Sequence, residues 1–292
     1  MLKIEVLIDA GARLGEGPLW DTAAKRLWWI DGWGRKVFRC DASGGDRRDW
    51  DVPSDIGAVI PRAAGGAIVA LADGLHDFDP ANGGLRKIVD PDPGNPRIRI
   101  NDGKVDRQGR LVFGYTDVEE KESLGRLYRM DADRKAHRLD EGYICVNGPC
   151  WSPDGRILYV ADSPRRIIHA YDYDTATGKI SNKRLFADFA ALGVPGYPDG
   201  ATVDAEGHVW STRMFGGGLA RLTPAGAVDR LVGLPVESVS SIAFGGPGLD
   251  IAYVTSMAQP WGDWKPRERE AGALFAIHGL GVRGIAEKPF AG

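Results

Sequence analysis

The stretch CWSPDGRILYV (residues 150–160) indicates the fold, because two short apolar runs flank a turn built on SPDG. Asp and Gly tolerate the backbone angles of tight hairpin turns, so the stretch predicts two antiparallel strands. A further run of aromatic and branched residues, IIHAYDYD (167–174), follows after a short loop. The segment therefore predicts a strand–turn–strand–loop–strand unit of an antiparallel sheet.

The same unit recurs along the whole chain at intervals of roughly 40 to 50 residues, the period of propeller blades. No long window shows the 3.6-residue apolar periodicity of a helix. A β-sandwich also has many short strands, but nothing in that fold requires this period. The sequence predicts an all-β fold, a six-bladed β-propeller of four-stranded antiparallel blades, with residues 1–292 as a single domain. The recurring runs are RLWWI (26–30), AIVAL (67–71), RLVFG (110–114), RILYV (156–160), HVWST (208–212) and DIAYVTS (250–256).

The composition narrows the class of protein further. The 292 residues include 40 Gly and 18 Pro, spread along the chain as many tight turns require. With 37 Lys plus Arg against 40 Asp plus Glu, the chain lacks the basic surface of a nucleic-acid-binding protein. No apolar run approaches the roughly 20 residues of a membrane helix, and the N-terminal segment lacks a secretion signal. We expect neither a nucleic-acid nor a membrane partner.

The three cysteines, Cys40, Cys145 and Cys150, point to a reducing compartment. Their number is odd and no CxxC spacing occurs, which argues against a disulfide framework and against a zinc ribbon. We expect each cysteine to be a small, buried apolar side chain. The sequence thus predicts a cytoplasmic protein.

Alignment of the repeats places four polar residues in equivalent positions. The position lies five residues before the turn that follows the first strand of each repeat. Ser240 occupies it in the last repeat, and the second repeat has Ile56 there with Asp55 beside it. The first strands of propeller blades surround the axis, so their initial residues should converge at one mouth of the channel. The four polar residues are Glu16, Asn101, Asn147 and Asp199.

Two carboxylates and two carboxamides at one point form an oxygen-rich cluster. Ca²⁺, Mg²⁺ and Mn²⁺ favour such ligands. Alternatively, each residue could cap the end of a strand through turn hydrogen bonds, as Asn and Asp often do. The matched register of all four residues favours a metal site over that alternative.

The register also predicts which loops border this mouth. The connections between the second and third strands of each repeat open on the same face, and two of them are long. Residues 115–125 are acidic, and residues 257–272 carry Trp261 and Trp264. We expect these loops to form substrate walls or a lid. Three arginines on this face are candidates to meet an anionic substrate: Arg165, Arg166 and Arg213.

Several segments resemble the SMP-30/gluconolactonase family of sugar lactonases, the regucalcin-like proteins. Xylonolactonases and arabinonolactonases are among the most similar members. The motifs GEGP, RxND, NGP and PDG occur in the family's order, and the similarity extends over nearly the whole chain. The segments are LGEGPLWD (14–21), RIRINDGKVDRQGRLVFG (97–114), VNGPCWSPDGRILYVADS (146–163) and YPDGATVDAEGHVW (197–210).

The resemblance implies a six-bladed propeller with one divalent metal ion, which could be Ca, Zn, Mn, Mg or Fe. It implies that Glu16, Asn147 and Asp199 hold this ion. These are three of the four polar positions that the repeat alignment selects. The resemblance assigns the fourth position, Asn101, to the substrate.

The resemblance also implies the residues that contact the substrate. Arg99 and Asn101 belong to the RxND motif, and a family glutamate in the 115–125 loop corresponds to Glu119. This loop reads GYTDVEE where a threonine–methionine pair is common after the Gly. Either Asp117 or Glu120 could therefore take the place of Glu119.

The resemblance therefore implies metal-assisted hydrolysis of an aldonolactone to its aldonic acid in sugar catabolism. The substrate is expected to be a small sugar lactone of the gluconolactone, xylonolactone or arabinonolactone type. The resemblance suggests that Asp199 is both metal ligand and general base. Two alternatives remain, a metal-dependent esterase or organophosphatase on the same propeller and a non-catalytic binding propeller. We expect a monomer or a small homo-oligomer.

Overall fold

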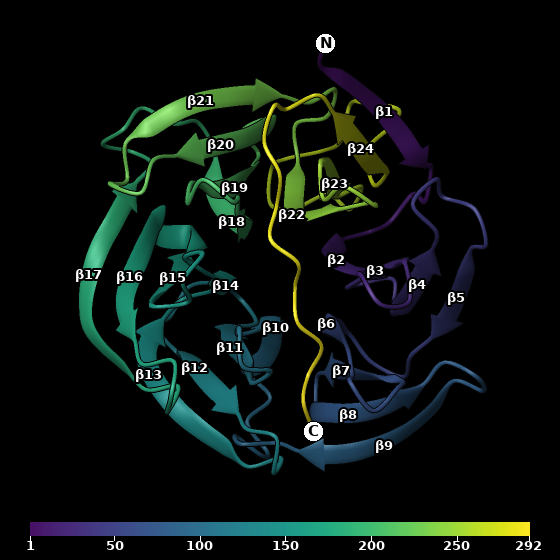
Figure 1. The fold of residues 1–292 in the computed structure, drawn as a ribbon, viewed down its shortest axis with the longest axis vertical. Coiled ribbons are helices and arrows are strands. Elements are labelled where there is room, and N and C mark those ends of the chain that lie inside the picture. Colours follow the sequence, from purple (N-terminus) through teal and green to yellow (C-terminus); the bar gives the residue numbers. More distant parts are fainter.

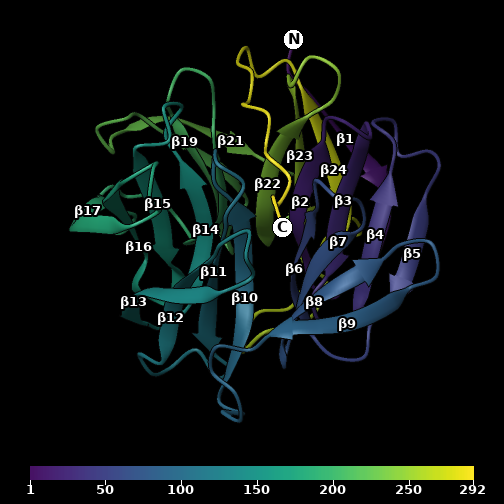
Figure 2. The ribbon, with the colours of Figure 1, turned by 60° about the horizontal axis from the view of Figure 1, so that its bottom comes forward.

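The six repeats form six blades around a common axis. The computed structural model describes residues 1–292, and Figure 1 shows the blades as a closed ring viewed down this axis. Each blade is a four-stranded antiparallel sheet, so the prediction of an all-β, six-bladed β-propeller is confirmed. Figure 2 shows the molecule from the side, with the innermost strands near its centre.

Five blades take their four strands in chain order, from the axis outward. The first two are β2 (Gly15–Asp21), β3 (Arg26–Asp31), β4 (Lys36–Cys40) and β5 (Arg48–Asp51), then β6 (Ile56–Pro61), β7 (Ala67–Leu71), β8 (Gly74–Asp79) and β9 (Gly84–Val89). The third is β10 (Ile98–Val105), β11 (Leu111–Asp117), β12 (Gly125–Met130) and β13 (Ala136–Tyr143). The fourth and fifth are β14 (Val146–Trp151), β15 (Ile157–Asp162), β16 (Ile167–Tyr173) and β17 (Ile180–Asp188), then β18 (Tyr197–Val203), β19 (Val209–Met214), β20 (Gly218–Leu222) and β21 (Val228–Gly233).

The sixth blade joins the two ends of the chain. It consists of β22 (Val239–Gly245), β23 (Ile251–Ser256) and β24 (Leu274–His278), and its outermost strand is the N-terminal β1 (Lys3–Ile8). Strand β1 pairs antiparallel with β24, with Lys3 opposite His278 and Val6 opposite Phe275. The repeat pattern did not reveal this closure, because β1 precedes the first repeat. Backbone hydrogen bonds between the chain ends therefore close the ring.

Burial decreases from the axis outward. The innermost strands β6, β14 and β22 are buried at every residue, because each lies between neighbouring blades. The outermost strands β5 and β9 contain no buried residue. The apolar runs of the sequence pack between blades; Ala58, Ile100 and Phe113, for example, share one cluster across the second and third blades.

The cysteines behave as small apolar side chains, as predicted. Cys40, Cys145 and Cys150 are all free and buried. Burial raises the pKa of the Cys40 and Cys150 thiols to about 12, so both are neutral at physiological pH. The chain contains no helix with the length and hydrophobicity needed to cross a bilayer.

The C-terminal segment 279–292 crosses one end of the ring, as Figure 1 shows. It passes over the turns between first and second strands: Ala205 N donates to Arg283 O at 2.8 Å, and Ala291 N donates to Gly109 O at 2.9 Å. Phe290 is fully buried in the cluster between the second and third blades. This end of the axis is therefore covered. The innermost strand of each blade begins at the opposite end of the axis.

A β-bulge interrupts the first pair of strands in every blade at the same place. The register shifts between Glu16 and Leu19, between Asn147 and Cys150, and at equivalent points of the other four blades. A bulge re-aims the side chains next to it. The bulges fall on the positions that the repeat alignment selected, so they set the direction of the candidate site residues.

Candidate functional site

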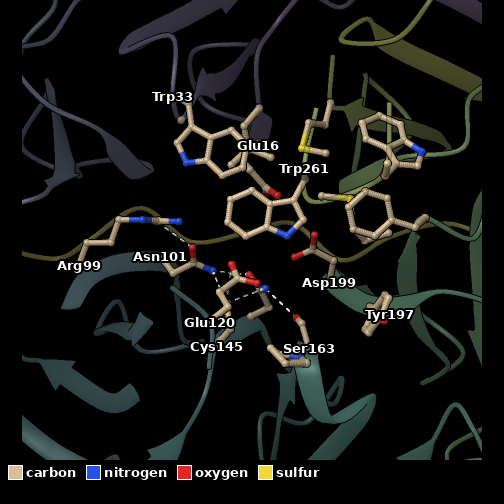
Figure 3. Close-up of a pocket in the computed structure, with 18 of the residues that line it drawn as sticks. Glu16, Trp33, Arg99, Asn101, Glu120, Cys145, Ser163, Tyr197, Asp199 and Trp261 are labelled. Atoms are coloured by element: carbon tan, nitrogen blue, oxygen red, sulfur yellow. Dashed lines mark hydrogen bonds between the residues drawn. The ribbon is translucent and has the colours of Figure 1, made fainter. Parts of the chain in front are cut away.

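A pocket of about 560 Å³ lies where the innermost strands begin. It brings together the residues that the family resemblance assigned to the metal ion and the substrate, from four different blades. Figure 3 shows several of them converging. Ile56 also lines the pocket, whereas Ser240 does not and instead bonds Thr255 Oγ1 at 3.0 Å. The residues brought together are Glu16 on β2, Arg99 and Asn101 on β10, Glu119 after β11, Asn147 on β14 and Asp199 on β18.

Two of these residues, Glu16 and Asp199, are carboxylic acids held close to other acids. Desolvation raises the pKa of both carboxyl groups. Repulsion raises them further, from Asp102 on Glu16 and from Glu16 on Asp199. In the chain alone, the charged forms of this pair are therefore disfavoured, and a bound cation would reverse that effect.

The side chain of Asn147 is fixed between two partners. Asn101 Nδ2 donates to Asn147 Oδ1 at 2.8 Å, and Asn147 Nδ2 donates to Ser163 Oγ at 2.8 Å. An amide oxygen has a second lone pair, so Asn147 Oδ1 can accept this hydrogen bond and still bind a further ligand. Asn147 is thus oriented before any ligand arrives.

The backbone beside Asn147 is held by Asp102, a residue that the sequence analysis did not single out. Gly148 N donates to Asp102 Oδ2 at 2.8 Å. Gly148 has a left-handed φ of +55°, and a Cβ there would lie 2.7 Å from the backbone oxygen of Asp199. Two candidate ligands, Asn147 and Asp199, therefore lie on strands that approach each other more closely than any residue but Gly permits.

Arg99 and Asn101 lie one above the other on β10. Arg99 Nη1 donates to Asn101 Oδ1 at 2.8 Å. Because Asn101 donates in turn to Asn147, the three side chains form a chain of hydrogen bonds along one side of the pocket. The remaining N–H groups of Arg99 make it a donor for ligand oxygens.

The 115–125 loop offers two glutamates to the pocket, and their carboxylates have different surroundings. The Glu119 side chain is 72% exposed and pairs with Lys121 at 3.0 Å. Glu120 is half-buried, and burial raises its pKa while nearby Arg99 lowers it. Figure 3 shows Glu120 beside Asn101. Of the two, the geometry favours Glu120 for contact with a ligand.

Asp117, the third acidic residue considered in this loop, shapes its backbone. Its Oδ2 accepts hydrogen bonds from Lys121 N at 3.0 Å and from Glu122 N at 2.8 Å. These bonds, that from Glu122 first, hold the pKa of Asp117 below its ordinary value. Asp117 therefore stabilises the turn that presents Glu120.

The three arginines expected on this face do not line the pocket. Arg165 bonds Asp162 and Gly142 O, and Arg166 donates to Val194 O at 2.8 Å. Arg213 is buried near Gly217, with desolvation lowering its pKa. These arginines stabilise loops around the pocket. The expectation that they meet a substrate is wrong, because none of them reaches the pocket.

A second acidic cluster lies at the end of β18 covered by the C-terminal segment. Asp204, Glu206 and His208 have potential ligand atoms within 4.8 Å of one another. However, Arg221 donates to Asp204 Oδ2 at 2.8 Å and to Glu206 Oε2 at 2.6 Å. These carboxylates are already paired, so the cluster is an ion-pair network.

The pocket also contains residues that sequence reasoning missed. Cys145 lies two residues before Asn147, and the Asn101 amide donates to its sulfur at 3.3 Å. Ser163 begins the short 3-10 helix η1 (Ser163–Arg165) and Trp33 lies between β3 and β4, and the repeat pattern does not encode the direction of either side chain. The spacing of two residues along a strand, which puts side chains on the same face, could have pointed to Cys145.

The fold and the pocket define a β-propeller with a ligand site on its axis, lined by acids, amides and a guanidinium group, as small polar ligands require. The family follows from comparison with known proteins. The model of the SMP-30/gluconolactonase/LRE-like region matches residues 14–258, and the chain belongs to this family. The family resemblance noted in the sequence is thereby confirmed.

Individual relatives cover the whole propeller. Regucalcin of Xenopus laevis is 34% identical over 298 residues, which are 100% of this chain and 99% of regucalcin. The 6-deoxy-6-sulfogluconolactonase of Pseudomonas putida is 34% identical and covers 96% of this chain and 95% of its own. The crystal structure of a calcium-binding protein, regucalcin from Agrobacterium tumefaciens, has a TM-score of 0.90 and 26% identity, and the match covers 98% of this chain and 96% of that one.

Proposed function

We propose that the protein is a metal-dependent lactonase that hydrolyses an aldonolactone to the corresponding aldonic acid. The observation that carries the proposal is the meeting of Glu16, Asn147 and Asp199 in one axial pocket. Membership of the family and the similarity to a sulfogluconolactonase support a lactone hydrolase, which is an ester hydrolase. The substrate is then a small molecule.

The donor set fits a divalent cation. Two carboxyl groups that burial and mutual repulsion hold at raised pKa values, beside an oriented amide oxygen, form an all-oxygen site for a hard cation. Glu16, Asn147 and Asp199 would hold the ion. When bound, the ion would polarise the lactone carbonyl and stabilise negative charge on its oxygen. The similarity to a calcium-binding regucalcin supports a divalent ion without selecting calcium.

The chain's own residues then divide the remaining tasks. Arg99 is placed to donate hydrogen bonds to ring hydroxyls, and Glu120 to accept them. The Asn101 amide group donates to Val146 O and Asn147 Oδ1, so Asn101 can meet the substrate through the second lone pair of its oxygen. Asp199 accepts a proton from the attacking water. The water oxygen adds to the carbonyl carbon, the ring C–O bond breaks, and the ring oxygen takes the proton from Asp199.

The test measures the acid released from lactones by pH-stat titration. Protein dialysed against EDTA should hydrolyse gluconolactone, xylonolactone and arabinonolactone at no more than the uncatalysed rate, and one of Ca²⁺, Mg²⁺, Mn²⁺ or Zn²⁺ should restore activity. Asp199→Asn should remain inactive with any metal. Asp172→Asn, which removes an exposed carboxylate paired with Arg184 on an outer surface, is the matched control and should retain activity.

The outcomes also separate the alternatives. Full activity after EDTA treatment would contradict metal dependence. Hydrolysis of aryl esters or phosphotriesters in preference to every sugar lactone would identify the esterase or organophosphatase. Binding of lactones without turnover under all conditions would identify a binding propeller.

We also propose the setting in which the enzyme acts. Three free, buried thiols suit the reducing cytoplasm. The pairing of β1 with β24 supports treating residues 1–292 as one domain. We expect a monomer or a small homo-oligomer.

A further inference from the structure

Five of the residues that line the pocket are aromatic. We call the aromatic wall the set of Trp33, Tyr197, Phe215, Trp261 and Trp264, which all line the cavity. Figure 3 shows Trp33 and Trp261 on the side of the pocket away from Glu120, Cys145 and Ser163. None of the five wall residues carries a charge or an amide group, so the wall offers a ligand an apolar surface beside the polar residues of the pocket.

The aromatic wall is built by ring contacts between loops of different blades. Trp33 and Trp261 stack with centroids 5.2 Å apart and planes 20° apart. Phe215 lies 5.2 Å from Trp264, and Tyr197 meets Phe215 edge-on at 6.2 Å. Ring pairs in these arrangements are stabilised by more than the burial of their apolar surface alone. The backbone bridge between Trp261 and Trp264 joins these two groups of rings, which come from the first, fifth and sixth blades.

The loop that carries Trp261 and Trp264 is fixed to its neighbours. Ala258 N donates to Ala12 O at 3.0 Å, and Arg13 Nε donates to Gln259 Oε1 at 3.0 Å. Trp264 Nε1 donates to Glu237 Oε2 at 2.9 Å. The wall is thus held in place before a ligand binds, which lowers the entropy lost on binding.

The size of the cavity exceeds what one lactone ring needs. Its volume of about 560 Å³ lies in the range of sites that enclose drug-sized ligands. A single lactone ring is smaller than such ligands, so a ring held by Arg99 and Asp199 would leave space for a further group. Trp261 is 37% exposed and Tyr197 is 40% exposed, so the unfilled wall leaves large apolar groups in contact with water.

We propose that the aromatic wall is a subsite for an apolar substituent on the lactone ring, so that the enzyme also hydrolyses alkyl- or aryl-substituted lactones. This inference rests on the proposed lactonase function. The chemistry is unchanged: water adds its oxygen to the carbonyl carbon, the ring C–O bond breaks, and the ring oxygen takes a proton. The product is a hydroxy acid whose apolar chain remains against the wall.

An apolar substituent fits the wall better than a second sugar ring does. The hydroxyl groups of a second sugar would lose their water and need hydrogen-bond partners at the wall. The wall offers only indole N–H groups and one phenol, and Trp264 Nε1 already donates to Glu237. An alkyl or aryl group loses no hydrogen bonds there and gains the full effect of burial.

The test compares kcat/KM for δ-decanolactone, which bears a pentyl chain, with that for unsubstituted δ-valerolactone, in metal-loaded protein. Burial of one methylene group is worth about a fourfold change. Partial burial of five carbons should make the ratio at least about tenfold in the wild type. Trp33→Ala and Trp261→Ala should each lower this ratio by about fivefold or more, with Trp33→Phe intermediate.

The matched control is Leu185→Ala, which removes an exposed apolar side chain from the outer strand β17. Its ratio should equal that of the wild type. A binding measurement checks the subsite without turnover: in calorimetry, a pentyl-substituted δ-lactam should bind at least about tenfold more tightly than the unsubstituted lactam, and Trp33→Ala should remove the difference.

The outcomes distinguish failure of the apolar subsite from failure of the proposed lactonase function. If gluconolactone is hydrolysed but the ratio is one or less, or if the tryptophan variants leave the ratio unchanged, the apolar subsite is wrong and the lactonase stands. If a disaccharide lactone is preferred over both probes, the wall binds a sugar ring and the inference fails. If no lactone is hydrolysed with any metal, both proposals fail.

Discussion

The close approach of β14 and β18 can be tested with two glycines of equal backbone strain. Gly148 follows Asn147 with a φ of +55°, and Gly17 follows Glu16 with a φ of +53°. A Cβ at Gly148 would lie 2.7 Å from Asp199 O and 2.8 Å from Ala201 Cβ, whereas a Cβ at Gly17 would have no atom within 4 Å. Ala at either position must adopt the unfavourable left-handed backbone conformation, but only at position 148 would its Cβ also collide with a neighbouring strand.

The magnitudes follow from these two contributions. The left-handed conformation alone costs about 1–2 kcal/mol, which is the expected loss for Gly17→Ala. Overpacking adds about 1–3 kcal/mol, so Gly148→Ala should lose about 2–5 kcal/mol. At about 2 °C per kcal/mol for a chain of this size, the melting temperature should fall by roughly 2–4 °C for Gly17→Ala and by roughly 4–10 °C for Gly148→Ala.

The affinity for a divalent ion should distinguish the two variants more clearly than their stability does. In Gly148→Ala the strands must move apart and displace Asn147 relative to Asp199, so divalent-ion affinity measured by calorimetry should fall about 10–100-fold. Gly17→Ala keeps the N–H that donates to Glu16 Oε2 at 3.1 Å and should change affinity by less than about threefold. Equal affinities for the two variants would refute the view that strand approach sets the ligand geometry.

Two further changes test other parts of the structure. Glu120→Gln should lower kcat/KM for a sugar lactone by about 10-fold or more, because it removes the charge of a half-buried acceptor. Glu119→Gln should lower kcat/KM by less than about twofold, because the Glu119 side chain is exposed. A larger effect of Glu119→Gln than of Glu120→Gln would reverse the assignment. Burial would raise the pKa of Asp77, but hydrogen bonds from Arg134 and Arg86 outweigh it and lower this pKa. The charged form therefore stabilises the fold above the unfolded pKa of about 4, and this stability is lost as pH falls through the lower folded pKa. In urea titrations Asp77→Asn should cost about 1–3 kcal/mol at pH 7 and progressively less below about pH 4, and a cost that stayed constant down to pH 2.5 would contradict this.

The repeated strand–turn–strand units made the fold predictable. Each unit carries its own turn residues and apolar runs, so a period of roughly 40 to 50 residues is visible without any long-range contact. The same regularity placed Glu16, Asn101, Asn147 and Asp199 in equivalent positions, and the structure brings all four to one pocket. Local patterns repeated around an axis are therefore sufficient to locate the centre of the site.

Elements outside the repeat were not predictable in this way. Strand β1 has no turn partner nearby and pairs with β24 only because the ring brings the two chain ends together. The segment 279–292 has no strand pattern and is defined by contacts with turns of several blades. Their positions depend on the completed ring.

The sequence by itself determined the class of fold, the family and the residues at the axis, because these follow from short-range turn chemistry and a repeated register. Only the tertiary structure distinguishes the two loop carboxylates, because the Glu119 side chain is exposed and paired with Lys121 whereas Glu120 is half-buried. It also decided that Asp102 supports Asn147 through Gly148, and that tryptophans from the first and sixth blades stack into one wall. These contacts join residues of different blades, and their geometry is fixed only when the blades pack around the common axis.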